Sequence, residues 1–331
     1  MPGGHASRSE EWTARDAAGV LRTPTARDHK YSRGVVVLRT GSSAYPGAAV
    51  LSAEGAWRAG VGMVRWDGPS EVAGLVLQRR PETVIGPGRA DAWVVGSGVD
   101  ARTRGEAETR RLRSFLREGA HPTVLDAGAL DLAAEAAGPI VVTPHEDELR
   151  EVRIPLGFGI DDVEDDPLAP RLHGPFRERL LVVRETAVAL GGVVLLKGSS
   201  TIVATPGGWW TAVRAGTPWL STAGTGDVLA GAMGAVLAGA AAGARVAGRR
   251  LDAEELGPIA ATAAWLHGTA GRIAAGQATE DVAGTDIRGA DRAAGPRGAV
   301  ADAPAAASGR PITALDVAAA LPAAFAAAFS A

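Results

Sequence analysis

Residues 221–231 read Ser-Thr-Ala-Gly-Thr-Gly-Asp-Val-Leu-Ala-Gly and carry the clearest signal in the chain. Small residues let the backbone approach a ligand closely, and the free N–H groups at the start of the helix predicted over residues 227–237 can bind an anion. Two interpretations stay open on these residues alone. Asp227 is either the routine cap of a helix after a glycine turn, or an acid–base group beside an oxyanion nest at Gly224–Gly226.

Outward from this stretch, short apolar runs alternate with segments of helical length. The runs are continuous rather than alternating, which is typical of strands that are covered on both faces of a parallel sheet. Strand, helix and strand in alternation predict a three-layer α/β domain with a mostly parallel central sheet. The predicted strands are 35–38, 93–95, 123–125, 140–142 and 193–196, and the predicted helices are 48–60, 101–118, 147–152, 227–237 and 314–328.

The loops that follow these strands are rich in Gly, Ser, Thr, Asp and His. Ligands bind such sheets at the carboxyl ends of the strands, so function is expected in these loops. They cover residues 41–47, 96–100, 126–130, 143–148 and 197–201.

The loop Lys197-Gly198-Ser199-Ser200-Thr201 offers a cation, hydroxyls and amides to one anion. The alternative is a solvated hairpin turn. His145 stands where ligands bind and can donate or accept a proton near neutral pH. The acidic residues after it suit the first turn of a helix. His267 is interpreted as a packing residue on a late helix.

The usual nucleotide fingerprints are absent. A dinucleotide-binding loop needs a third glycine at position 229, which is Leu229, and a Walker A loop needs its lysine after a glycine, whereas Lys197 precedes Gly198. The chain therefore predicts neither a classical dinucleotide fold nor a P-loop.

Composition excludes several classes of protein. The 331 residues suffice for one large domain or two ordinary ones, and the net charge of -3 argues against nucleic acid as a partner. Without cysteine there is no disulfide, thiolate nucleophile or Cys-ligated metal. The first 29 residues lack the apolar core of a signal peptide, and the apolar run 229–243 is too short to cross a bilayer, so we expect a cytoplasmic protein without a membrane partner.

Taken together and in order, these segments resemble the ADP-dependent (S)-NAD(P)H-hydrate dehydratase family, which has a ribokinase-like fold. The match is collinear over residues 29–325. The chain departs from the family's motifs at Thr40, Pro46, Ser97, Gly128, Glu146 and Asp147. The matching segments are His29-Lys30, Thr40–Ala49, Pro81-Glu82, Gly96–Gly98, Leu125–Leu130, Thr143–Glu148, Leu196–Thr201, Ala223–Gly231, His267–Gly271 and Leu321-Pro322.

The resemblance implies a single ribokinase-like α/β/α domain over residues 29–331, after a polar N-terminal tail over residues 1–28. Accessory loops are expected near 157–175 and 276–311. The resemblance also implies a homotetramer.

The resemblance also implies a site. Asp227 would be the catalytic base and would contact substrate together with Ala48, Gly98 and His145. The nucleotide, ADP or alternatively ATP, would bind Lys197, Gly198, Ser199, Ser200, Thr201, Gly224, Thr225 and Gly226. Mg²⁺ is expected as the counterion of the phosphates, with no ligand residue assigned.

The implied reaction is repair of nicotinamide cofactors damaged by hydration. (6S)-NADHX or NADPHX would be dehydrated to NADH or NADPH, with release of AMP and phosphate. Two alternatives remain. One is a small-molecule kinase of the same fold that acts on a vitamin precursor, and the other is a nucleotide-binding protein without turnover.

Overall fold

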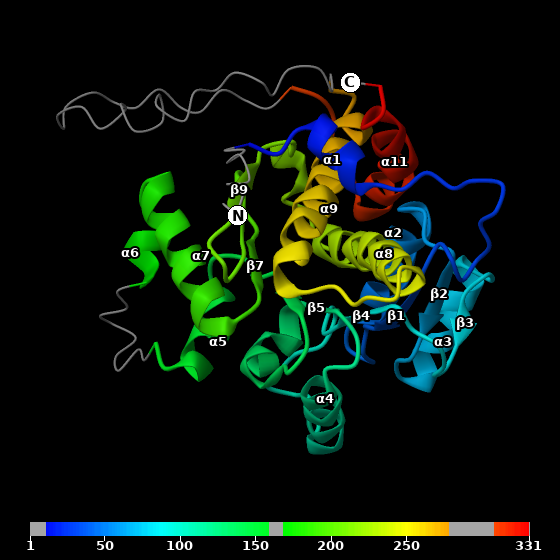
Figure 1. Cartoon of the computed structure of the whole chain (residues 1–331), viewed down its shortest axis with the longest axis horizontal. Coiled ribbons are helices and arrows are strands. Elements are labelled where there is room, and N and C mark those ends of the chain that lie inside the picture. Colours follow the sequence, from blue (N-terminus) through cyan, green and yellow to red (C-terminus); the bar gives the residue numbers. More distant parts are fainter. Residues whose placement is uncertain (1–10, 159–167, 278–307, 331) are drawn as a thin grey trace.

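The computed structural model describes residues 11–158, 168–277 and 308–330. These residues fold around a nine-stranded sheet in the order β3-β2-β1-β4-β5-β6-β7-β8-β9 (Figure 1). Neighbours from β3 to β7 pair in parallel, while β8 pairs antiparallel with β7 and with β9. The strands are β1 Val35–Arg39, β2 Met63–Trp66, β3 Val84–Ile85, β4 Ala92–Val95, β5 Thr123–Leu125, β6 Ile140–Val142, β7 Val193–Leu196, β8 Thr201–Ala204 and β9 Trp210–Val213.

Helices cover both faces of this sheet, so the predicted three-layer α/β architecture is confirmed. Along β7, Val193 and Leu195 join one core while Val194 and Leu196 join the other. The first core packs under α1 Ala14–Val20, α2 Pro46–Arg58, α3 Ser70–Arg79, α8 Thr225–Val246, α9 Ala253–Ala274 and α11 Ala314–Ala327. The second packs under α4 Glu106–Glu118, η1 Ala127–Glu135, α5 Leu149–Arg153, α6 Leu168–Leu172 and α7 Phe176–Leu190.

The five predicted strands are all present within one residue of their expected ends. Four further strands were not predicted, because β2 contains Arg65, β3 has only two residues, and β8 and β9 form antiparallel pairs at one side. Helices α3 and α7 were not predicted either, and of α9 only the placement of His267 on a late helix was predicted, which is confirmed. Helix α4 begins at Glu106 rather than at residue 101, since residues 101–103 form a turn.

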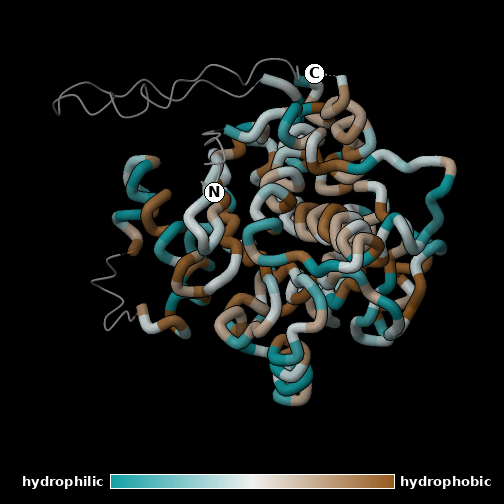
Figure 2. Tube along the Cα trace, in the orientation of Figure 1, coloured by the Kyte–Doolittle hydropathy of each residue, from teal (hydrophilic) through white to brown (hydrophobic). Residues whose placement is uncertain are grey.

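Helix α8 runs for 22 residues, twice the predicted length, through the centre of the molecule. It is long and apolar enough to cross a membrane, but 72% of its most apolar 18-residue stretch is buried inside the fold. Its glycines allow close packing. A Cβ on Gly231 would lie 2.0 Å from the Ser52 carbonyl oxygen, and one on Gly234 would lie 2.2 Å from Val94 Cγ2. Figure 2 shows α8 as one of the most hydrophobic segments, whereas the outlying α4 is largely hydrophilic.

The expected polar tail over residues 1–28 is wrong for residues 12–21. Thr13 and Asp16 form a capping box that starts α1. Trp12 is buried and donates its indole N–H to Thr262 Oγ1 in α9 at 3.2 Å, and Ala17 is fully buried. A few apolar residues among many charged ones suffice here because α9 supplies the surface that they cover.

The two expected accessory loops are only partly described. Residues 168–172 of the first form α6 and bury Leu168 and Leu172. Residues 159–167 of the first and 278–307 of the second lie outside the described residues.

Candidate active site

The loops after β1, β4, β5, β6 and β7 meet at the carboxyl edge of the sheet, as expected for parallel strands. Gly41, after β1, donates its backbone N–H to the Ser97 carbonyl, after β4, at 2.7 Å. Gly98 has a left-handed φ of 70°, and a Cβ there would lie 2.3 Å from Ala48 Cβ. Ala48 and Gly98, two of the four residues predicted to bind substrate, therefore pack against each other.

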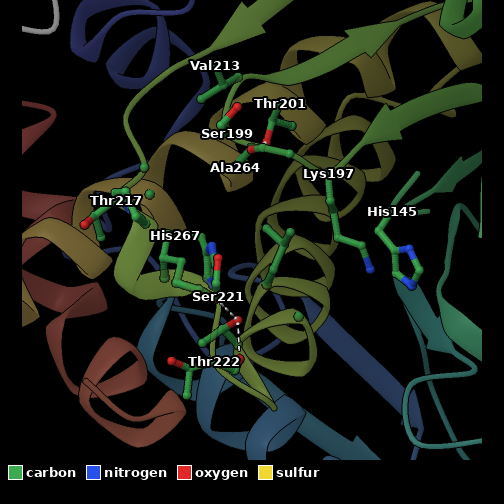
Figure 3. Close-up of a pocket in the computed structure, with 18 residues that line it drawn as sticks. His145, Lys197, Ser199, Thr201, Val213, Thr217, Ser221, Thr222, Ala264 and His267 are labelled. Atoms are coloured by element: carbon green, nitrogen blue, oxygen red, sulfur yellow. Dashed lines mark hydrogen bonds between the residues drawn. The ribbon is translucent and has the colours of Figure 1, made fainter. Parts of the chain in front are cut away.

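A cavity of about 630 Å³ opens beside these loops (Figure 3). It is lined by apolar side chains such as Leu220 and Leu229 together with polar groups from several elements. Of the predicted site residues, Ser200, Gly224, Asp227, Ala48 and Gly98 are not among those that line it. Those that do line it are His145, Lys197, Gly198, Ser199, Thr201, Thr225 and Gly226.

The loop 197–201 forms the predicted hairpin, while anion binding by it stays a prediction. It joins β7 to β8 as an antiparallel hairpin, and it also lines the cavity. Lys197 Nζ lies 3.1 Å from Asp126 Oδ1 and 3.4 Å from Glu148 Oε2. Burial opposes the charge of the lysine, but these two carboxylates outweigh it and hold the pKa of Lys197 above its ordinary value. The lysine is thus a fixed cation at neutral pH.

The start of α8 lies against this cation. A Cβ on Gly226 would be 3.9 Å from Lys197 Nζ. The N-cap is Gly224, which has a left-handed φ of 89° and provides no side-chain cap. The ammonium and the first-turn N–H groups of α8 therefore face the same space, which suits a phosphoryl group.

Asp227 does not cap the helix. Among the described residues, none donates a hydrogen bond to its carboxylate and none forms an ion pair with it, so the capping interpretation is wrong. Burial, followed by the negative charge of Asp126, raises the pKa of Asp227 to about 7, while Lys197 acts in the opposite direction. A carboxylate with this pKa can accept a proton near neutral pH.

Asp126 is a site residue that the sequence analysis did not single out. It is buried, and its carboxylate accepts hydrogen bonds from Ser97 Oγ and Thr143 Oγ1, each at 2.8 Å, as well as from Lys197. The available signal was its position directly after β5, in one of the predicted functional loops. What the sequence did not show is that three other loops direct polar groups at it.

His145 lies with Lys197, not with Ala48 and Gly98. Its Nε2 is 3.4 Å from Glu148 Oε1, and its backbone N–H donates to Glu148 Oε2 at 2.9 Å. Glu148 therefore connects the histidine to the lysine, and Figure 3 shows both side chains at the same side of the cavity.

His267 is buried, as predicted, but it also lines the cavity. Its Nε2 has no hydrogen-bond partner among the described residues. Burial lowers the pKa of His267 to about 4; the Thr225 backbone opposes this effect and the positive charge of Lys197 adds to it, so the ring is neutral at physiological pH. A neutral imidazole can donate one hydrogen bond into the cavity.

The described residues contain no group of three or more His, Cys, Asp or Glu side chains that could hold a metal ion. Asp126 and Glu148, the carboxylates beside the cavity, are both occupied by Lys197. A dedicated all-protein metal site does not fit this arrangement.

A family model described as NAD(P)H-hydrate dehydratase matches residues 35–290, well over half of the chain. The chain belongs to the NAD(P)H-hydrate dehydratase family. The predicted resemblance is thereby confirmed.

Relatives of this family also match along the sequence. The chain is 38% identical over 239 residues to the bifunctional NAD(P)H-hydrate repair enzyme Nnr of Mycobacterium tuberculosis, covering 68% of this chain and 45% of the relative. It is 32% identical over 286 residues to the enzyme of that name from Gloeobacter violaceus, covering 79% and 49%. The chain thus spans about half the length of these relatives.

The fold is shared with a solved structure. The ADP/ATP-dependent NAD(P)H-hydrate dehydratase from Bacillus subtilis, co-crystallised with ATP and Mg²⁺, superposes with a TM-score of 0.70 at 22% identity, covering 97% of this chain and 99% of that one. The predicted ribokinase-like fold is confirmed, since a family member of that fold aligns along nearly the whole chain.

Proposed function

We propose that the chain is a hydro-lyase that dehydrates (6S)-NADHX and NADPHX to NADH and NADPH, using ADP and releasing AMP and phosphate. The observation that carries this proposal is Asp227, with a pKa of about 7, in the first turn of α8 beside the Lys197 ammonium. The relatives' shared description as NAD(P)H-hydrate repair enzymes supplies the substrate class.

The chemistry solves a leaving-group problem. Hydroxide leaves carbon poorly, whereas phosphate leaves well. Asp227 takes the proton of the C6 hydroxyl while the hydroxyl oxygen attacks the β-phosphorus of ADP. A new P–O bond forms, and the bond between the β-phosphorus and the oxygen of AMP breaks. The C6–O bond of the ester then breaks, and phosphate departs with the bonding pair. Loss of a proton from C5 to the departing phosphate or to water then gives the C5=C6 bond of the reduced nicotinamide.

The residues at the start of α8 stabilise the phosphoryl transfer. The backbone N–H of Gly226 and the ammonium of Lys197 would stabilise the negative charge that develops on the phosphoryl oxygens, whereas the Thr225 N–H already donates to the Thr222 carbonyl at 3.3 Å. Gly198, Ser199, Ser200 and Thr201 would bind the remaining phosphate and the nucleotide from the β7–β8 hairpin.

The hydrated nicotinamide would lie on the other side of Asp227. Gly98 and Ala48 leave room there because neither has a side chain beyond Cβ, and His145 would contact the substrate from the β6 loop. Contacts between these loops support this placement. Gly98 approaches Ala48, and the neighbouring Ser97 binds Asp126, which in turn binds Lys197.

Mg²⁺ bound to the nucleotide phosphates would supply charge neutralisation, and no residue of the chain is assigned to it. ADP is proposed as the cosubstrate, with ATP as an alternative in which ADP is released. We also propose a cytoplasmic protein, and the family resemblance supports a homotetramer, which light scattering would test as a particle of four chains of 33.6 kDa.

The deciding experiment is a dehydratase assay on hydrated NADH with ADP and ATP in parallel. We expect absorbance at 340 nm to return with one or both nucleotides and Asp227→Ala to abolish the signal. If the native protein restores no absorbance with either, the proposal fails. A stable phosphate ester instead of AMP plus free phosphate would identify a small-molecule kinase, and calorimetric ADP binding without reaction would identify a binding protein.

A further inference from the structure

The Asp126 carboxylate accepts hydrogen bonds on both of its oxygens. One carboxylate oxygen, Oδ2, accepts from Ser97 Oγ at 2.8 Å, and the other, Oδ1, accepts from Thr143 Oγ1 at 2.8 Å and from Lys197 Nζ at 3.1 Å. Three loops, after β4, β6 and β7, thus converge on one buried side chain. Both oxygens of the Asp126 carboxylate therefore serve as hydrogen-bond acceptors for these loops.

The backbone beside Asp126 is strained. Ala127 has φ of 44°, and it is the one residue other than glycine with positive φ in the described part of the chain. The left-handed region is unfavourable for a residue that has a Cβ. Such strain persists where the surroundings fix the conformation, and here it turns the chain out of β5 so that the Asp126 side chain stays under the three donors.

Asp126 acts on both groups at the start of α8. Asp126 Oδ1 lies 3.1 Å from Lys197 Nζ, and a Cβ on Gly226 would lie 3.9 Å from that nitrogen. Its negative charge also reaches Asp227, where it is the second cause, after burial, of the raised pKa. Lys197 is the other charged group that acts on Asp227, while Glu148 and His267 face Lys197.

We propose that Asp126 is a positioning residue, locked by the Ser97 and Thr143 hydroxyls, that fixes the Lys197 ammonium at the first turn of α8. From this position its negative charge also raises the pKa of Asp227. The proposal rests on the proposed function only for its catalytic consequence. The geometry it assigns is a property of the free protein.

The Ser97 hydroxyl is one of the three donors to Asp126. Position 97 is one of those at which this chain departs from the motifs of the family that it resembles. Ser97 is fully buried and its hydroxyl donates to Asp126 Oδ2. The serine that this chain has here therefore contributes a hydrogen bond to Asp126.

The test compares Asp126→Asn and Ser97→Ala with the native chain. Asp131→Asn is a matched control, because Asp131 lies on the same η1 segment and pairs with Arg104 away from the cavity. The readouts are a ¹³C NMR titration of the Asp227 carboxyl, calorimetric binding of ADP, and the pH profile of dehydration. The first two need no turnover, so they decide the inference even if the chain proves not to be a dehydratase.

For Asp126→Asn we expect the Asp227 titration and the acidic limb of the pH profile to move down by at least about half a pH unit. We also expect the turnover number to fall by about tenfold or more and ADP affinity to fall by about threefold or more. Ser97→Ala keeps the charge, so it should weaken ADP binding by about threefold with little change in the Asp227 titration. The control should match the native chain.

An Asp227 titration that stays in place in Asp126→Asn would overturn the inference, whatever the activity. If that variant does not fold, Ser97→Ala decides. Weakened ADP binding in Ser97→Ala then supports the locking role, and native ADP affinity contradicts it.

Discussion

A buried and a half-buried carboxylate on neighbouring helices behave in opposite ways. Glu54 on α2 and Asp227 on α8 each adjoin the point where the helices touch, since a Cβ on Gly55 would lie 2.3 Å from the Val228 oxygen. Glu54 is 1% exposed and pairs with Arg58, Arg79 and Arg80. Asp227 has no paired cation and faces the negative charge of Asp126.

The difference shows that burial alone does not define a reactive acid. Burial by itself would raise the pKa of Glu54, but the hydrogen bonds and charges of its arginines hold that pKa below the ordinary value. For Asp227, burial and Asp126 act together and raise the pKa to about 7. Glu54 therefore stabilises the fold, whereas Asp227 is kept available for proton transfer.

The largest expected effect is on catalysis. Asp227→Asn should lower the turnover number of dehydration by about 10³-fold, because a positioned general base contributes roughly 10²–10⁴-fold. ADP binding should remain, since the lysine and the backbone donors are unchanged. Steady-state kinetics and calorimetry measure the two quantities. Equal activity in native and Asp227→Asn chains would remove Asp227 from the mechanism.

Glu54→Gln should act on stability instead. The amide cannot compensate the three arginines, so we expect the free energy of unfolding to fall by about 3 kcal/mol. Activity per folded molecule should stay native, because Glu54 does not line the cavity. Chemical denaturation measures the loss. A neutral effect on unfolding with a loss of activity would reverse the roles that we assign to the two acids.

The pH dependence of stability should differ between the two acids. The raised pKa of Asp227 means that between about pH 4 and 7 the folded state binds more protons than the unfolded state, so its contribution becomes less favourable as pH rises. Asp227→Asn should thus be more stable than the native chain at pH 8, by about 2 kcal/mol after allowance for solvent screening, with the advantage vanishing near pH 4. The lowered pKa of Glu54 gives stability that is present above pH 4.5 and lost as pH falls. Denaturation series at several pH values for both variants would show these opposite slopes, and parallel slopes would contradict the comparison.

The smallest effect is expected for a single arginine of the Glu54 cluster. Arg58 is 31% exposed and lies one helical turn from Glu54, with an Nε–Oε2 distance of 3.0 Å. Arg58→Ala should cost only about 0.5 kcal/mol, because Arg79 and Arg80 remain and exposed pairs are weak. Arg80→Ala should cost more, since Arg80 is 18% exposed and binds the same carboxylate at 2.6 Å. Thermal unfolding of both variants would test this order.

Much of the fold could be predicted because its core strands are continuous apolar runs. The segments 123–125, 140–142 and 193–196 correspond to β5, β6 and β7 without adjustment. The errors fell where the local pattern is weak: β3 has two residues, and α1 buries a few apolar residues among charged ones. Their structure depends on neighbours that are distant in the sequence, such as α9 for Trp12.

The candidate site divides in a similar way. The glycine-rich turn into α8 and the Lys197 hairpin could be found from the sequence, because each is a local pattern with a physical purpose. Asp126 could not be singled out, since its significance comes from donors at positions 97, 143 and 197. The absence of a cap hydrogen bond on Asp227 also required the three-dimensional arrangement.

The sequence by itself determined the layered α/β fold, the loops that bear function and the family, because strand periodicity, turn residues and ordered motifs are written along the chain. Only the tertiary structure decided the electrostatics. It placed Glu54 among three cations and Asp227 beside Asp126, and it held Lys197 at the start of α8. A pKa depends on burial and on charges within a few ångströms, and those distances exist only once the chain has folded.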